Sequence, residues 1–87
     1  MLPTYTVPHD KIPELIGRLK DLNCVVLFQS DKKILWCSAA DAPNKTINVY
    51  FMTSEGEEFC YVTGVLGRKK KEVFAKFAAA LQGLEGN

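Results

Sequence analysis

The sequence has a single histidine, only three cysteines and no CxxC pair. Zinc sites are usually built from closely spaced pairs of cysteine or histidine, and Cys24, Cys37 and Cys60 are far apart. We therefore expect no metal site and no cofactor. All three cysteines lie in apolar segments, which favours small buried side chains in a reducing, cytoplasmic compartment.

Long apolar runs are missing as well. No stretch approaches the roughly 20 residues that a membrane-spanning helix needs. The first residues, MLPTYTVPHD, lack the basic start and apolar core of a secretion signal. The net charge is only +1, so any affinity for nucleic acid has to come from a local patch. We expect one cytoplasmic domain over residues 1–87 with no membrane partner.

Signatures of catalysis are also lacking. His9 is the single histidine, and no nucleophile lies at a recognisable spacing from it. Cys37 and Cys60 lack the flanking residues typical of reactive thiols. No serine or threonine sits in a strand–turn–helix nucleophile elbow. The sequence thus predicts that the chain is not an enzyme.

What the sequence does contain is a change of apolar period. Residues 1–9 carry two prolines and predict an extended arm or a short edge strand. Apolar residues then recur at helical spacing between Ile12 and Leu22, and Asp10 is the expected N-cap of this helix. A second helical pattern runs from about residue 69 to 82 and ends at Gly83.

Four segments between these helices predict strands joined by turns. They are CVVLF, read as buried on both faces, then ILWCS, KTINVYFMT and FCYVTGVL. Their short connections favour antiparallel neighbours. The predicted fold class is therefore α+β, a two-layer arrangement of helix, four-stranded antiparallel meander and helix, with both helices on one face of the sheet.

Large apolar side chains point to both faces of the predicted strands, and two short helices cover only one. One set holds Trp36, Ile47, Phe51, Phe59 and Tyr61, and the other holds Leu35, Tyr50, Met52 and Val62. The sequence leaves open which set the helices cover. Because monomers rarely expose large apolar patches, we expect a homodimer or another protein partner. The interaction-face candidates are Trp36, Tyr50, Met52 and Tyr61.

Four cations open the second helix, at the end where the helix dipole disfavours positive charge. This basic turn comprises Arg68, Lys69, Lys70 and Lys71. Free N–H groups and cations at a helix start suit an anion, so the basic turn is a candidate site for an anion or a nucleic acid, with the sheet aromatics as a stacking platform. Alternatively, the acidic turn of Glu55, Glu57 and Glu58 neutralises the cations, within the chain or across a dimer.

The leading hypothesis is a small non-enzymatic binding protein, a regulator, adaptor or inhibitor that acts through protein–protein contacts of its sheet face. The alternative is a nucleic-acid-binding protein that uses the basic turn at residues 68–71 together with the sheet aromatics.

Overall fold

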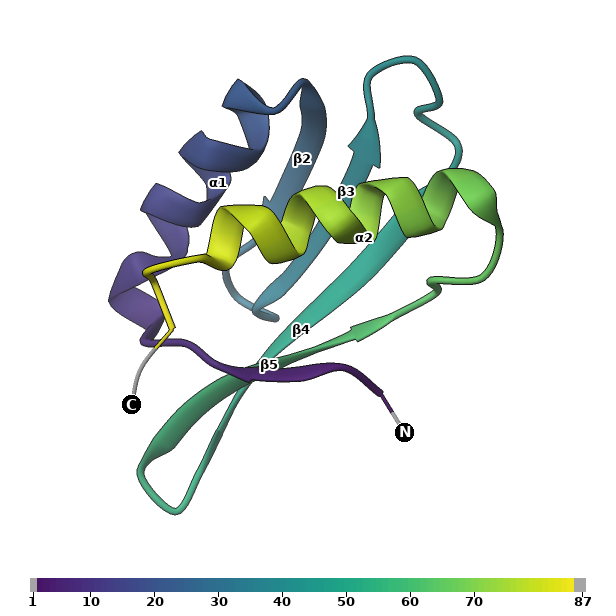
Figure 1. Ribbon diagram of the computed structural model, residues 1–87. Coiled ribbons are helices and arrows are strands. Elements are labelled where there is room, and N and C mark those ends of the chain that lie inside the picture. The colour runs from purple at the N-terminus through teal and green to yellow at the C-terminus, as the bar shows by residue number, and fades with distance from the viewer. Residues whose placement is uncertain (1, 86–87) are drawn as a thin grey trace.

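A five-stranded antiparallel sheet forms the framework of the computed structural model, which describes residues 2–85 (Figure 1). Two helices and a short 3₁₀ helix complete it. In chain order the elements are β1 (Thr4–Thr6), η1 (His9–Lys11), α1 (Ile12–Asp21), β2 (Cys24–Gln29), β3 (Ile34–Ala39), β4 (Thr46–Ser54), β5 (Glu57–Thr63) and α2 (Arg68–Leu81). The strand order in the sheet is β1-β5-β4-β3-β2.

The predicted α+β class with an antiparallel sheet is confirmed, but the predicted arrangement is wrong in detail. The sheet has five strands, so as a whole it is not the four-stranded meander that we expected. The extra strand is β1, which comes from the predicted arm and pairs Tyr5 with Cys60 of β5. β1 is thus the short edge strand that residues 1–9 predict as one option, and it precedes α1.

The start of α1 also differs from the prediction, because Asp10 does not cap it. Lys11 holds the N-cap position and makes no side-chain hydrogen bond there. The chain first forms η1, in which the Lys11 N–H donates to the Pro8 carbonyl over 2.9 Å. The His9 N–H donates to Glu58 Oε1 over 3.0 Å, so β5 supplies the acceptor at this turn.

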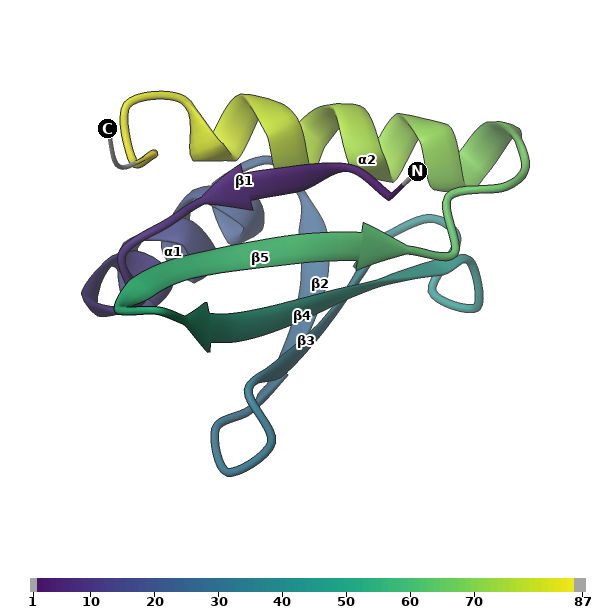
Figure 2. The same ribbon diagram turned by 90° about the horizontal axis from the view of Figure 1, so that it is seen from below.

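Both helices lie on the same side of the sheet, and within residues 2–85 the opposite side carries no helix (Figure 2). α1 packs on β2, and α2 packs on β3 and β4. The largest fully buried side chains come from both layers: Phe77, Leu15, Leu19, Leu35, Ile47, Leu81, Val7, Val49, Val62 and Val73, with Cys37 and Cys60. The core therefore lies between the helices and one sheet face, which we call the covered face.

Strand register decides which side chains reach the covered face. It shows that the two sets of apolar residues predicted from the sequence are wrong. Ile47 lies opposite Cys37, and Val62 lies opposite Val49, all of them buried. Trp36 does not belong with Ile47, because it pairs with Asn48 on the other face. Residues directly opposite one another in an antiparallel pair share a face, so register, not position along each strand alone, fixes the division.

The turn between β4 and β5 sets this register. Glu55 and Gly56 have φ angles of 53° and 79°, as a two-residue type I′ turn requires, and Ser54 pairs with Glu57. Even-numbered residues of β4 therefore share a face with odd-numbered residues of β5.

The prediction that β2 is buried on both faces is also wrong. Cys24 is buried, whereas Val25 and Leu27 on the other face are 51% and 64% exposed. One side of β2 thus faces the core, whereas the described residues leave Val25 and Leu27 on its other side largely exposed.

Arg18 ties the two helices together. Its Nη1 donates to the carbonyl oxygens of Ala80, over 3.2 Å, and Gln82, over 2.6 Å. These carbonyls belong to the last turn of α2 and its C-cap, where acceptors have no partner within the helix. Nη2 of the same guanidinium binds Glu14 over 2.8 Å, four residues earlier on α1.

We predict that Arg18→Ala lowers the free energy of unfolding by about 1–2 kcal/mol, because it removes charged donors from two helix-terminal carbonyls. Glu14→Gln is the control. It weakens only an exposed i,i+4 pair, so it should cost at most about 0.5 kcal/mol. Urea unfolding followed by circular dichroism measures both. Equal costs for the two variants would contradict the role of Arg18.

Candidate interaction surfaces

The uncovered side of the sheet, which we call the open face, gathers apolar side chains from four strands. Cross-strand pairing places these residues together: Val25 and Leu27 of β2, Ile34 and Trp36 of β3, Tyr50 and Met52 of β4, and Phe59 and Tyr61 of β5. All four interaction-face candidates, Trp36, Tyr50, Met52 and Tyr61, are therefore on one face. The two sets predicted from the sequence divide these four residues between opposite faces. Neither set includes Val25, Leu27 or Ile34.

Charge is almost absent from the open face. Among the strand residues that pair onto it, Glu57 at the β4–β5 turn is the only charged one. Neutral polar residues make up the rest: Thr4, Thr6, Gln29, Ser38, Thr46, Asn48, Ser54 and Thr63. A core of aromatics and methionine that is free of lysine and arginine resembles the centre of a protein–protein interface.

Two local features give the open face its shape. The rings of Tyr50 and Tyr61 stack with their centroids 5.1 Å apart and an angle of 16° between their planes. Beside them lies a shallow hollow of about 180 Å³, lined by Val25, Leu27, Trp36, Ser38, Pro43 and Thr46. The face thus offers both a flat aromatic centre and a recess large enough for a side chain.

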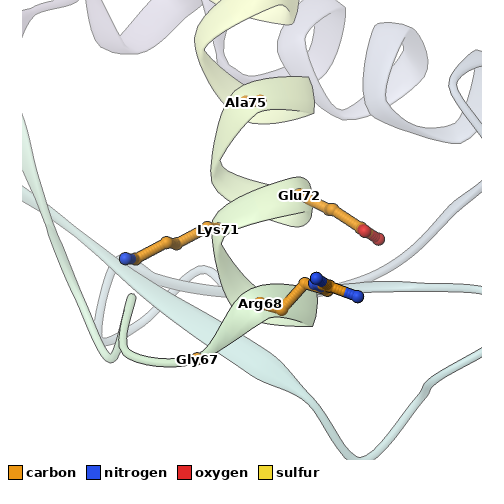
Figure 3. A pocket seen from close by; sticks show the side chains of 5 residues that line it. All are labelled: Gly67, Arg68, Lys71, Glu72 and Ala75. Atoms are coloured by element: carbon orange, nitrogen blue, oxygen red, sulfur yellow. The ribbon is translucent and has the colours of Figure 1, made fainter.

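The basic turn lies on the helix side of the sheet, at the N-terminus of α2 (Figure 3). Gly67, with φ of 100°, precedes it as N-cap and offers no side-chain acceptor to the first N–H groups of the helix. Arg68 and Lys71 point to opposite sides of α2, and Glu72 lies on the side of Arg68 (Figure 3). The cations therefore do not all converge on one point.

Two hollows adjoin this helix start. One, of about 550 Å³, is lined by Gly67, Arg68, Lys71, Glu72 and Ala75. The other, of about 370 Å³, is lined by Lys45, Leu66, Gly67, Arg68, Lys69 and Lys70. Lys45 is a cation that the sequence did not single out, because it joins the basic turn only through the fold. Leu66 is 86% exposed beside them.

Lys69 has acidic partners, which partly offset the unfavourable positive charge at the N-terminus of α2. Its Nζ lies 3.0 Å from Asp41 Oδ2 and 3.5 Å from Glu72 Oε2. The hydrogen bond from Lys69 lowers the pKa of Asp41, and the same bond raises the pKa of Lys69. Both groups are exposed to solvent, so this ion pair contributes little to the stability of the fold. Its main effect is to offset part of the positive charge at the start of α2.

The acidic turn does not neutralise the basic turn within the chain. The β4–β5 turn and the start of α2 lie at opposite ends of the molecule (Figure 1). Glu57 accepts a hydrogen bond from Thr6 over 3.4 Å, and Glu58 lies 3.2 Å from His9 Nδ1. That part of the alternative is wrong, and pairing between copies stays a prediction.

Groups with reactive chemistry are buried and scattered. The His9 side chain is 8% exposed, packs edge-on against Phe51, and has no hydrogen-bond partner for Nε2. Burial raises the pKa of Cys37 and of Cys60 to about 12, which keeps both as thiols at neutral pH. Across residues 2–85, no group of three or more metal-ligating side chains comes together. In that same range, no helix is long and apolar enough to cross a membrane.

Comparison with known protein families, with curated proteins and with solved structures found no match to this chain. The interpretation of both surfaces therefore rests on their geometry.

Proposed function

We propose that this chain is a non-enzymatic binding protein, a regulator, adaptor or inhibitor that acts through its open face. The observation that carries the proposal is the apolar, nearly uncharged character of that face. Four strands about 4.8 Å apart and about seven residues long span roughly 450 Å² in projection, and apolar side chains hold about half of the positions on this face. Apolar patches of a few hundred Å² on monomers are commonly functional.

The partner that we propose for the open face is a second copy of the chain. A face whose one charged strand residue, Glu57, lies at its end meets an identical face with little like-charge repulsion. Two sheets of this kind pack with their strands nearly aligned and about 10 Å apart, and the side chains between them form a second core. A two-fold axis also lets one patch cover the other, so a homodimer needs no further surface.

Three free, buried cysteines support a place in the cytoplasm, where thiols stay reduced.

We predict that the wild-type chain self-associates at micromolar concentration and that Tyr61→Lys weakens this association by roughly ten- to a hundredfold. The new ammonium has to lose water to enter the contact, and each factor of ten corresponds to about 1.4 kcal/mol. Trp36→Lys, Tyr50→Lys and Met52→Lys should act in the same direction. Sedimentation velocity over a range of concentrations measures the effect.

Ala75→Lys is the matched control. Ala75 is exposed on α2, on the helix side of the molecule, so the same charge is added away from the open face. It should leave self-association unchanged. A wild-type chain that shows no association through the open face, or equal effects of Tyr61→Lys and Ala75→Lys, would contradict the proposal.

The second candidate function is nucleic-acid binding at the basic turn. The presence of Lys45 in the same hollow as Arg68, Lys69 and Lys70 favours it. However, these cations lie at the start of α2, on the side of the sheet where Figure 2 shows both helices, whereas strand pairing places the aromatics on the opposite face. One strand of nucleic acid cannot easily use both, so we rank this candidate second.

The test for the second candidate is the salt dependence of binding to generic DNA and RNA. If the four cations contact phosphates, log affinity for duplex DNA should fall against log salt with a slope of roughly −3 to −4. Replacing Arg68, Lys69, Lys70 and Lys71 together by Gln should then abolish binding. We expect no such slope for the wild type, and a steep one would promote this candidate over the first.

A further inference from the structure

The two edges of the sheet are built very differently. The β1 edge is a strand of three residues with Pro3 before it and Pro8 after it. The β2 edge has six residues, CVVLFQ, with no charge, no proline and no glycine. Edge strands usually carry charges, prolines or bulges that prevent them from pairing with another chain. β2 lacks all of these within the strand.

Hydrogen bonds in the sheet reveal which backbone groups of β2 point outward. The Phe51 N–H donates to the Lys33 carbonyl over 2.9 Å, so odd-numbered residues of β3 bond to β4. Even-numbered residues of β3 therefore bond to β2, in agreement with the 3.1 Å bond from the Ala40 N–H to the Asn23 carbonyl. Their partners are Val25, Leu27 and Gln29.

By strand alternation, the N–H and C=O groups of Cys24, Val26 and Phe28 point away from β3. In the part of the chain that the structure describes, no other strand of the sheet lies on that side of β2. Within residues 2–85, no backbone hydrogen bond from a turn, loop or cap reaches these three residues either. The edge thus presents a row of backbone donors and acceptors that lack a partner within the described chain.

Apolar side chains next to this edge are also incompletely covered. Ile16, Val26 and Phe28 pack against the core but are only partly buried. Arg18 faces the end of α2. Ile16 precedes Arg18 by two residues, so the two side chains point about 200° apart around the axis of α1. Ile16 therefore faces away from α2, on the side of the free edge. The outward backbone groups have an apolar strip beside them.

We propose that β2 pairs antiparallel with β2 of a second copy, with Val26 at the two-fold axis. Val26 then faces Val26 of the second copy, and Cys24 faces Phe28, so the outward groups of each strand become the partners of the other. Within the paired strands no charges meet, because β2 has none. The side-chain alternation also continues, with Val25 and Leu27 extending the open face across the junction.

This edge junction is separate from the contact in the proposed function and rests on it only in taking a second copy as partner. The junction lies in the plane of the sheet, whereas the open-face contact lies perpendicular to it. The two contacts use different atoms and do not compete. Together they join four copies, as two continuous sheets that pack face to face.

The direct test is amide hydrogen exchange of the wild-type chain, followed residue by residue by NMR at several concentrations. The amides of Val26 and Phe28 should exchange slowly where the chain is associated and much faster on dilution. The amides of Val25 and Leu27 bond to β3 and should change far less. A contact through the open face alone makes no backbone bonds at the edge, so it cannot produce this alternating pattern.

Cysteine cross-linking gives a second readout. Opposed residues of a hydrogen-bonded pair have Cα atoms about 5.5 Å apart, which a disulfide can bridge. Val26→Cys should therefore form a covalent dimer on oxidation. The wild-type chain is the matched control. Its free Cys24 lies on the same strand but faces Phe28 of the second copy in this register, so the wild type should cross-link poorly.

The outcomes separate the two proposals. Protected Val26 and Phe28 amides in a Tyr61→Lys variant that still associates would support the edge junction whether or not the open-face contact exists. Fast exchange of both amides at concentrations where the wild type is associated would overturn the edge junction and leave the open-face contact standing. A wild-type chain that cross-links through Cys24 as fast as Val26→Cys does would overturn the proposed register.

Discussion

A five-stranded sheet has two faces and two edges, and residues 2–85 supply two α-helices and one short edge strand to cover them. Both helices lie on one face, and β1 closes one edge. The other face and the β2 edge keep the apolar composition of surfaces that are usually buried. Burial of apolar surface favours both folding and association. Covering the open face with a partner would therefore be favourable for the same physical reason as folding.

The aromatic side chains of the open face make its uncovered apolar area energetically important. Trp36, Tyr50 and Tyr61 belong to the side chains that bury about 150–250 Å² each when fully covered. Such anchors dominate the energetics of many interfaces, whereas the neutral threonines around them mainly exclude water. The charges of the chain are placed elsewhere, at the turns and on the outer sides of the helices. This separation is what distinguishes the open face from the basic turn.

The sequence predicted the elements well because their signals are local. Helical spacing marked α1 and α2, and alternation in KTINVYFMT put Ile47 on one face and Tyr50 on the other, as observed. The predicted assignment of apolar residues from different strands to the two sheet faces was wrong. That assignment depends on strand register, which the turns set. The two-residue turn at Glu55 and Gly56 places Tyr50 beside Tyr61, and its length could have been used to predict this. The pairing of Lys69 with Asp41 had no such signal, since 28 residues separate them.

The claim on which most of this account depends is that the open face is covered when the chain associates. Trp36 is the only tryptophan and lies in that face, so its fluorescence reports on the claim without any label. We expect its emission to shift to shorter wavelength, and its quenching by acrylamide to fall several-fold, as the concentration rises from nanomolar to high micromolar. In Tyr61→Lys both changes should need a roughly ten- to a hundredfold higher concentration, in line with its weaker association. Quenching of Trp36 that is the same at every concentration in the wild type would contradict the account.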